Sequence, residues 1–540
     1  MENNKNMNPI FSLKNFRSFG QDGADFELAP ITVLTGCNSA GKSSLVKALM
    51  LLSSSSEGGR YMENLKLSSK DLCLGGYKNV AHKDGNIIIA YKIWSADLQE
   101  PLIVTRKYCA KRNDELNEGA LYHFTVEKID GTLIYQMGPR WVDGGLEYVP
   151  HDDAIREEFN RFYAVGCYMR LMELLSILEK LKKKKPINNE SLQVKVKRSD
   201  DAVKIVKEKL KSVGVDESEA ALLWKEFDHH AFNTVVKTVE QRLGIGDKSV
   251  NVSDLIKMPD EEEVEFMLRE YIDHIVDDVC APFFTKQPIY INSASAQIER
   301  LYTIGNENKM CNALRELNRR KIQYANDVFP DTGIIYKPGS FLDRWIHAFK
   351  IGKGIKVTGT DQGLGLMAYL INEKEEERLL ADEGYGITQL VALLLQIDNC
   401  IPVELGCDED VLIRENKKVY EYEPKLICVE EPEVHLHPMF QSMLADMFVE
   451  AYQKYNIHFI IETHSEYLIR KLQVLVAEKK LKAENVSLNY VEKYNYVEKY
   501  ESGISTNRKI EILEDGRLSK PFGTGFFDES KNLVMKMLRF

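Results

Sequence analysis

The sequence predicts an α/β fold built on a parallel sheet, and three features of the chain lead to this prediction. Residues 31–34 form an apolar run that passes through a glycine-rich loop into an apolar helix beginning at Lys42. Residues 426–429 and 457–461 are continuous apolar runs, as expected for strands of a parallel sheet that is covered on both faces. Between these parts, residues 153–285 change to helical spacing, which predicts a helical insertion.

Length and composition limit the class of protein. The chain has 540 residues, more than one ordinary domain, and its 44% apolar and 28% charged residues are typical of a soluble globular protein. No run approaches the roughly 18 apolar residues that a membrane helix needs, and the polar residues 1–6 argue against a signal peptide. We therefore expect a cytoplasmic protein that makes no membrane contact.

Charge and cysteine content argue against two further classes. The net charge of −11 is unlike that of a protein that coats nucleic acid with its whole surface. The nine cysteines are an odd number, and no two have C-x-x-C spacing, which argues against a disulfide framework or a zinc knuckle. Isolated thiols fit a reducing compartment.

Residues 1–152 are predicted to form the first α/β part. Residues 9–35 are expected to hold two strands around a turn at Gln21-Asp22-Gly23, because the apolar alternation stops at these turn-forming residues. A helix is predicted over residues 42–53. Residues 70–150 are predicted to be rich in strands, because runs of β-branched residues alternate with Gly and Asp.

Residues 153–285 are predicted to form several separate helices. Pro186 and Gly214 interrupt the helical spacing, which argues against a long coiled coil. Within this segment, residues 180–211 carry twelve lysines and arginines against four carboxylates, a net charge of +8. This stretch is either a solvated loop and helix or a contact to nucleic-acid phosphates, and it lacks aromatic residues for base stacking. The sequence leaves both interpretations open.

Residues 286–540 are predicted to form the second α/β part. Residues 289–291 read as a short strand, and a glycine turn leads into an apolar helix over residues 386–397. A six-residue repeat in tandem over residues 489–500 is expected to be an extended strand or a hairpin, since two copies are too few for a solenoid.

The first motif with a chemical meaning is Gly36-Cys37-Asn38-Ser39-Ala40-Gly41-Lys42-Ser43, which matches G-x-x-x-x-G-K-[ST] between a predicted strand and a predicted helix. The glycines allow the backbone N–H groups to surround phosphate oxygens, and the helix directs its positive end at the same anion. Lys42 is expected to reach the β- and γ-phosphates, and the Ser43 hydroxyl is expected to hold Mg²⁺.

The second motif is the pair of acids after the apolar run 426–429. A parallel strand that ends in Glu430 and Glu431 places both at the carboxyl edge of the sheet, where the metal of a nucleotide sits. Glu430 is expected to support the Mg²⁺ ion, and Glu431 to act as the general base that polarises the attacking water. The alternative, a solvated acidic strand end, is less favoured once a phosphate loop is present.

Two weaker signals accompany these motifs. His464 follows the third apolar run in Glu462-Thr463-His464-Ser465, where it could contact the γ-phosphate and the attacking water. Residues 382–389 are a glycine-flanked helix start in which Thr388 is the expected N-cap. Such a start can bind a phosphate, but the bare pattern is equally that of an ordinary helix entry.

These motifs, in this order, resemble the ABC-type ATPase heads of the SMC and OLD-like group, and more closely the small bacterial AAA-family ATPases whose head is split in sequence. The resemblance covers roughly residues 8–150 and 285–540 and leaves out the helical middle. The segments that carry it are 15–19, 35–44, 74–82, 382–389, 430–438 and 463–465.

The resemblance implies an ABC-type P-loop ATPase head, split in sequence, with a helical insertion domain. Its N-terminal lobe would be residues 1–152, the insertion 153–285 and the C-terminal lobe 286–540. It implies ATP and Mg²⁺ as cofactors, with Ser43 and Glu430 at the metal and Glu431 and His464 as catalytic residues. The nucleotide-binding residues would be Gly36, Asn38, Ser39, Ala40, Gly41, Lys42, Ser43 and Ser44.

The resemblance also implies an oligomer. Residues 382–389 would be the signature motif, through which Gly384, Gly386, Thr388 and Gln389 contact ATP bound to the other subunit. Two heads would then sandwich two ATP molecules in a homodimer or a higher oligomer. Residues 436–437 fall where the family places a loop that faces the dimer partner.

Similar ATPases with large helical insertions are subunits of bacterial anti-phage defence systems of the Septu type, including retron-associated versions, in which an HNH-type nuclease is the partner. The resemblance therefore implies a bacterial ATPase that controls a partner nuclease. If the basic stretch 180–211 is a nucleic-acid contact, DNA or retron RNA–DNA would bind there. The segment after His464 is too short for a nuclease domain of ordinary size once the family tail is counted, so no nuclease activity of its own is expected. The alternative is an SMC- or OLD-like ATPase of DNA repair or chromosome maintenance.

Overall fold

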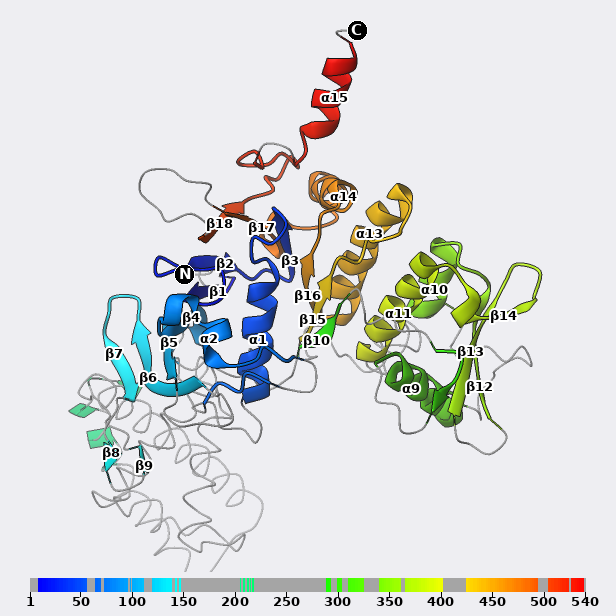
Figure 1. Ribbon diagram of the computed structural model, residues 1–540. Helices are drawn as coiled ribbons and strands as arrows, with labels where there is room; N and C mark the ends of the chain where they lie inside the picture. Colours follow the sequence, from blue (N-terminus) through cyan, green and yellow to red (C-terminus); the bar gives the residue numbers. More distant parts are fainter. Residues whose placement is uncertain are drawn as a thin grey trace, which may run out of the picture. The chain divides into compact units, whose positions relative to one another are not determined.

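A computed structural model of the chain describes most residues outside its central segment (Figure 1). The described residues are 8–55, 64–68, 72–95, 98, 100–110, 119–137, 141–142, 145–146, 204, 207–208, 211–212, 214, 216–217, 288–292, 299–303, 309–324, 339–360, 365–401, 424–493, 504–523 and 526–538. Contacts divide the chain into two compact units, one of Met1–Met7, Ala90–Lys107 and Leu121–Pro282, the other of Asn8–Ile89, Tyr108–Ala120 and Phe283–Phe540. Every residue predicted for the site belongs to the second unit.

The second unit is built on a six-stranded sheet of order β10-β15-β16-β3-β17-β18. The first five strands run parallel to their neighbours, and β18 is antiparallel to β17. Their bounds are β10 Ile289–Ile291, β15 Lys425–Glu430, β16 Ile457–Glu462, β3 Ile31–Gly36, β17 Val486–Lys493 and β18 Ser505–Ile510. The predicted parallel sheet is confirmed, and β3 from the N-terminal part of the chain lies between β16 and β17 from the C-terminal part.

The register of the three central strands determines which residues lie together at the candidate site. Glu430 at the end of β15 pairs with Glu462 at the end of β16, and Glu462 pairs with Leu34 near the end of β3. Parallel strands that end in register deliver their following loops to the same edge of the sheet. The phosphate loop, the paired acids and the segment before His464 therefore meet at one edge.

Apolar packing fixes this sheet. Every residue of β3 is buried, and Phe459 of β16 packs against Phe448 of a neighbouring helix with ring centroids 4.8 Å apart. Each such buried side chain contributes on the order of 2 kcal/mol to stability. The helices that flank the sheet are α1 Ser43–Ser55, α13 Pro438–Tyr455 and α14 Glu466–Ala477. The predicted signature residues begin α11 Tyr385–Cys400, which packs against α9 Lys309–Tyr324 and α10 Phe341–Ala348.

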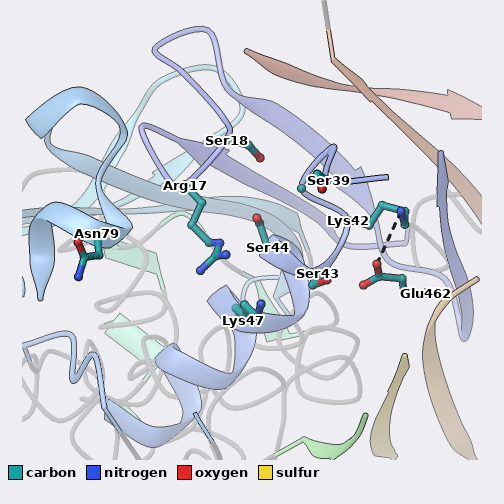
Figure 2. Close-up of a pocket in the computed structure, with 10 residues that line it drawn as sticks. Arg17, Ser18, Ser39, Lys42, Ser43, Ser44, Lys47, Asn79 and Glu462 are labelled. Atoms are coloured by element: carbon teal, nitrogen blue, oxygen red, sulfur yellow. Dashed lines mark ion pairs between the residues drawn. The ribbon is translucent and has the colours of Figure 1, made fainter. Parts of the chain in front are cut away.

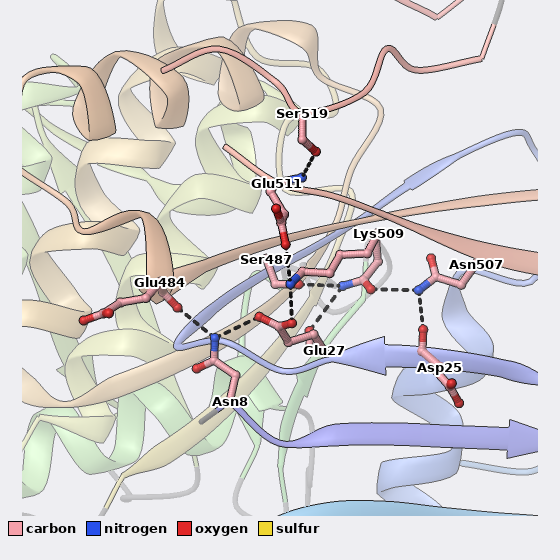
Figure 3. Close-up of polar contacts among 10 residues, drawn as sticks. Asn8, Asp25, Glu27, Glu484, Ser487, Asn507, Lys509, Glu511 and Ser519 are labelled. Atoms are coloured by element: carbon pink, nitrogen blue, oxygen red, sulfur yellow. Dashed lines mark hydrogen bonds and ion pairs between the residues drawn. The ribbon is translucent and has the colours of Figure 1, made fainter. Parts of the chain in front are cut away.

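Polar contacts join the N-terminal strands to the C-terminal hairpin (Figure 3). The Lys509 ammonium lies 2.5 Å from one carboxylate oxygen of Glu27, and the Asn8 amide donates to the other at 3.0 Å. The Asn507 amide donates to the carbonyl oxygen of Asp25 at 2.6 Å. Segments separated by more than 450 residues are thereby held together, as a head that is split in sequence requires.

The remaining described strands form a second six-stranded sheet and two smaller sheets. The six-stranded one has the strand order β2-β1-β4-β5-β6-β7, and burial alternates along β4, so that one face is covered. Its strands are β1 Ile10–Lys14, β2 Ala24–Glu27, β4 Ile87–Ser95, β5 Glu100–Ala110, β6 Gly119–Lys128 and β7 Leu133–Met137. The others are the hairpin of β8 Trp141–Val142 with β9 Gly145–Leu146, and a sheet of β11 Tyr302–Thr303, β12 Gly354–Gly359, β13 Gly365–Ile371 and β14 Glu377–Leu379. The other α-helices among the described residues are α2 Tyr77–Val80 and α15 Glu529–Met537.

Two local predictions are wrong. Residues 9–35 hold three strands and not two, because Ala24–Glu27 pairs with β1 in antiparallel register as a strand of its own before Pro30 separates it from β3. Thr388 is not the N-cap of α11: Gly384 occupies that position, and the Thr388 hydroxyl donates back to the carbonyl of Tyr385 at 2.7 Å. The predicted helix over 42–53 is confirmed as α1, two residues longer at its end.

Several predictions fall outside the described residues. They include the helical insertion 153–285 and the basic stretch 180–211, apart from single residues between 204 and 217, and the second copy of the tandem repeat. The domain boundaries at 152 and 285 also lie there and remain predictions. Among the helices that the structure describes, none is long and apolar enough to cross a membrane.

Candidate nucleotide-binding site

The phosphate loop has a backbone that only glycine can follow at two positions. Gly36 has φ +131°, and a Cβ there would lie 1.9 Å from the carbonyl oxygen of Val491. Gly41 has φ +97°, and its Cβ would lie 2.0 Å from the Ser18 hydroxyl oxygen. Both the left-handed conformation and the close approach exclude a side chain. The loop then enters α1 at Ser43, as the motif predicts.

Lys42 is buried and faces a cavity of about 430 Å³ at this edge (Figure 2). Its ammonium donates to the carbonyl of Cys37 at 3.1 Å and lies 3.8 Å from the Glu462 carboxylate. Burial lowers the pKa of Lys42 below its ordinary value, although the nearby carboxylates act to raise it. The cavity is lined by Arg17, Ser18, Ser39, Gly41, Lys42, Ser43, Ser44, Lys47, Asn79 and Glu462.

Two further cations face this cavity, and sequence reasoning gave them no role. Arg17 comes from the turn between β1 and β2, and Figure 2 shows it pointing toward Ser44 and Lys47 of α1. Burial lowers the pKa of both Arg17 and Lys47, and the Arg17 charge lowers that of Lys47 further. Within the part of the chain that the structure describes, neither forms an ion pair. The charges of Glu430 and Glu462 act to raise the pKa of Lys47 without forming an ion pair with it, and positive charge on this wall favours an anionic ligand.

Glu430, the last residue of β15, and Glu431, which follows it, have different surroundings. Glu430 bonds with the Tyr290 hydroxyl, while its Oε1 atom is buried and has no hydrogen-bond partner among the described residues. Burial, followed by the Glu430 charge, raises the pKa of Tyr290, so the phenol stays protonated as a donor. Glu431 has a left-handed backbone, φ +47°, and its N–H donates to the carbonyl of Glu462 at 2.7 Å. This bond ties the loop that carries Glu431 to the neighbouring strand.

His464 is positioned by a residue that the sequence gave no role, Glu433. The Glu433 carboxylate is 6% exposed, accepts the backbone N–H of His464 at 2.7 Å and bonds with the Thr463 hydroxyl. Burial raises the pKa of Glu433. Burial and the Lys42 charge lower the pKa of His464, so its imidazole is neutral at neutral pH and can accept a hydrogen bond. The position of Glu433 three residues after Glu430 is the one signal that the sequence offers.

The predicted signature residues lie at the start of α11, against the loop that follows β15. The Gln389 amide donates to the carbonyl of Glu431 at 3.2 Å. A Cβ at Gly386 would lie 2.6 Å from the carbonyl oxygen of His435, whereas a Cβ at Gly384 would meet nothing within 4 Å. Neither these residues nor Thr388 lines the cavity around Lys42.

The donor set at the sheet edge fits a magnesium ion. The Ser43 hydroxyl and the Glu430 carboxylate are the hard oxygen ligands that Mg²⁺ prefers. The Glu430 Oε1 atom is buried without a hydrogen-bond partner in the described region, and such an atom is stabilised by a cation.

His435 and His437 belong to the loop before α13, where His437 accepts the N–H of Met439 at 3.3 Å as the helix N-cap.

Comparisons with known proteins supply the family. The AAA ATPase domain matches residues 10–469, and a family described as a protein of unknown function matches residues 481–537. No match was found among curated proteins.

Solved structures similar to this chain include several SMC heads. The SMC head domain from Thermotoga maritima is 10% identical, with 94% of this chain and 100% of that chain covered and a TM-score of 0.33. An SMC head with an extended coiled coil, bound to the C-terminal domain of ScpA from Pyrococcus furiosus, is 11% identical, with 98% and 100% covered and a TM-score of 0.32. The SMC head bound to the C-winged helix domain of ScpA is 10% identical, with 93% and 98% covered and a TM-score of 0.33.

The AAA ATPase match extends over most of the chain and contains all three strand ends that form the site. It begins at β1, before the phosphate loop, and ends in α14, after His464. The protein is therefore a member of the AAA ATPase domain family.

Proposed function

We propose that this chain binds ATP with Mg²⁺ and hydrolyses it at the sheet edge formed by β3, β15 and β16. The observation that carries the proposal is the register that brings Lys42, the Glu430–Glu431 pair and the segment before His464 together. A phosphate-binding lysine, a metal-supporting carboxylate and a candidate base at one edge are the parts that phosphoryl transfer to water needs.

Each residue has a separate task in this mechanism. Lys42 and the loop N–H groups hold the β- and γ-phosphates, and Ser43 with Glu430 would hold Mg²⁺, which supplies charge neutralisation on the phosphates. Glu431 accepts the proton of the attacking water. His464, neutral and held by Glu433, accepts a hydrogen bond and orients that water or contacts the γ-phosphate. Arg17 and Lys47 add positive charge to the wall of the cavity.

The same proposal includes a dimer in which each head completes the site of its partner. Gly384, Gly386, Thr388 and Gln389 would contact ATP bound to the other subunit. Two features support this: the four residues do not line the cavity of their own chain, and the space next to Gly384 is open. A glycine with open space beside it at the start of a long helix suits close approach of a phosphate.

We further propose that the ATPase is a subunit of an anti-phage defence complex of the Septu type, in which it controls an HNH-type nuclease. The support is the resemblance of its motif order to such subunits. Nucleic acid would bind the basic segment 180–211, of which the structure describes only Lys204, Lys207, Glu208 and Lys211. The Lys207 ammonium there lies 2.7 Å from the Glu217 carboxylate. The competing proposal is an SMC- or OLD-like ATPase of DNA repair or chromosome maintenance.

Replacing the phosphate-loop lysine tests nucleotide binding. Lys42→Ala should reduce the affinity for a fluorescent ATP analogue by at least about 100-fold, because two charge-assisted bonds to phosphate are each worth about 1.5–3 kcal/mol. Titration of the analogue into the purified chain measures this. Lys353→Ala, at an exposed ion pair with Glu375, is the matched control and should bind as the wild type does. Unchanged affinity in Lys42→Ala would refute the assignment of the loop.

Replacing the candidate base separates binding from hydrolysis. Glu431→Gln should keep ATP affinity but slow turnover by about 10²–10⁴-fold, the usual contribution of a general base. ATP-bound dimers should then accumulate and be visible by size-exclusion chromatography with light scattering. Glu466→Gln, on the first turn of α14, is the control. Wild-type turnover in Glu431→Gln would remove Glu431 from this role.

The two signature glycines give different expectations. Gly384→Ala meets no steric obstacle, so it should leave the melting temperature and the ATP affinity of the isolated head almost unchanged while reducing ATP-dependent dimerisation at least about 10-fold. Gly386→Ala should also lower the melting temperature, because its Cβ would collide with the backbone of His435. Full dimerisation of Gly384→Ala would contradict the contact in trans.

Co-purification tests the defence proposal. The tagged chain, co-expressed with the product of its adjacent gene, should retain an HNH-type nuclease in a stable complex, and the nuclease should cut DNA more slowly in the complex than alone. The Glu431→Gln variant, which holds ATP, should alter that restraint. If no nuclease is retained and DNA instead stimulates ATP hydrolysis, the repair or chromosome alternative is supported.

A further inference from the structure

Glu462, at the end of β16, is the residue whose surroundings most strongly indicate an additional role. It stands beside Glu430 in the register of the sheet and lines the cavity that contains Lys42. Its surface is 7% exposed, so it is an almost fully buried carboxylate. In the sequence it lies between the apolar run 457–461 and His464, and the pattern indicates no chemical role for it.

Glu462 engages the two side chains that the nucleotide and its metal need. One carboxylate oxygen lies 3.8 Å from the Lys42 ammonium (Figure 2). Burial raises the pKa of the carboxylate, whereas the Ser43 hydroxyl is close enough to act to lower that pKa. Lys42 and Ser43 are the residues that hold phosphate and Mg²⁺ in the proposed function. A single carboxylate therefore faces both side chains.

The second oxygen of this carboxylate is different. Glu462 Oε2 is buried and has no hydrogen-bond partner within the described residues, and the same is true of Glu430 Oε1 on the adjacent strand. Buried carboxylate oxygens are normally satisfied, since an unpartnered one costs free energy. Two such atoms, on strands paired in register, provide oxygen ligands that a divalent cation could use.

A purely structural ion pair explains this arrangement less well. The 3.8 Å separation from Lys42 is long for a buried pair, and an ion pair retained for stability would have both oxygens satisfied. Glu430 stands beside Glu462 in the register of the sheet, so two carboxylates share this edge with Lys42.

We propose that Glu462 belongs to the divalent-cation site with Ser43 and Glu430, and that binding of the cation transfers Glu462 from Lys42 to the metal. Lys42 is then released to bind the β- and γ-phosphates. The carboxylate thus makes tight nucleotide binding depend on the cation. This inference rests on the proposed function, because it assigns a further residue to the same site.

Glu462→Gln tests the inference through binding and not through turnover. The amide has the same shape but carries no charge, so it neither pairs with Lys42 as an ion nor binds a cation strongly. In nucleotide-free protein, Mn²⁺ affinity measured by electron paramagnetic resonance should fall at least about 10-fold. In EDTA, affinity for the fluorescent ATP analogue should rise several-fold, because Lys42 is free. Glu484→Gln, at an exposed ion pair with Lys482, is the matched control.

A second variant guards against an effect on folding. Glu462→Asp keeps the charge with a shorter reach, so its Mn²⁺ affinity should lie between those of the wild type and Glu462→Gln. Equal Mn²⁺ affinity in the wild type and Glu462→Gln, weaker ATP binding of Glu462→Gln in EDTA, or no gain of Asp over Gln would each overturn the inference. Failure of the proposed function has another signature: the wild type itself would not bind the ATP analogue with Mg²⁺.

Discussion

The arrangement of this site depends on one constraint, the in-register parallel pairing of β16 with β15 on one side and β3 on the other. A shift of one residue would turn every side chain at a strand end to the opposite face of the sheet. Glu430 and Glu462 would then no longer stand side by side, and Lys42 would lose the carboxylate that it faces. The apolar packing of Phe459 on Phe448 and the buried strand β3 hold this register.

The same register concentrates charge in a poorly solvated place. Lys42, Glu433 and Glu462 are each less than one-tenth exposed, and burial disfavours the ionised form of all three. Among the described residues, the contacts that offset this cost are few: the Lys42–Glu462 ion pair, a carbonyl for Lys42, a backbone N–H and the Thr463 hydroxyl for Glu433, and the Ser43 hydroxyl for Glu462. A site organised in this way is incompletely satisfied alone, and phosphate with a divalent cation would complete it.

The sequence predicts the parts of this site that follow from strand ends, and misses those that depend on which way a side chain points. Lys42, Ser43, Glu430 and Glu431 were predictable because the loop motif and an acid-terminated apolar run imply their edge of the sheet. Glu462 was not, because in a strand that is buried on both faces no alternation shows which residue faces a cavity. Arg17 reaches the cavity only through the tertiary placement of the turn after β1. The pattern predicts Thr388 as the N-cap of α11 because hydroxyls favour that position, but Gly384 fills it.

The start of α11, which holds the predicted signature residues, is joined to the loop that carries Glu431 within one chain. Gln389 bonds the carbonyl of Glu431, and Gly386 lies against the backbone of His435 with no room for a side chain. Glu431 sits in a left-handed conformation that costs about 1–2 kcal/mol and persists because its neighbours hold it. If the start of α11 touches the nucleotide of a second head, as proposed, a displacement of that helix would act on Glu431, the proposed base of its own head, through these contacts. Coupling of this kind is reciprocal, so the state of the nucleotide in one site would change the affinity for the nucleotide in the other.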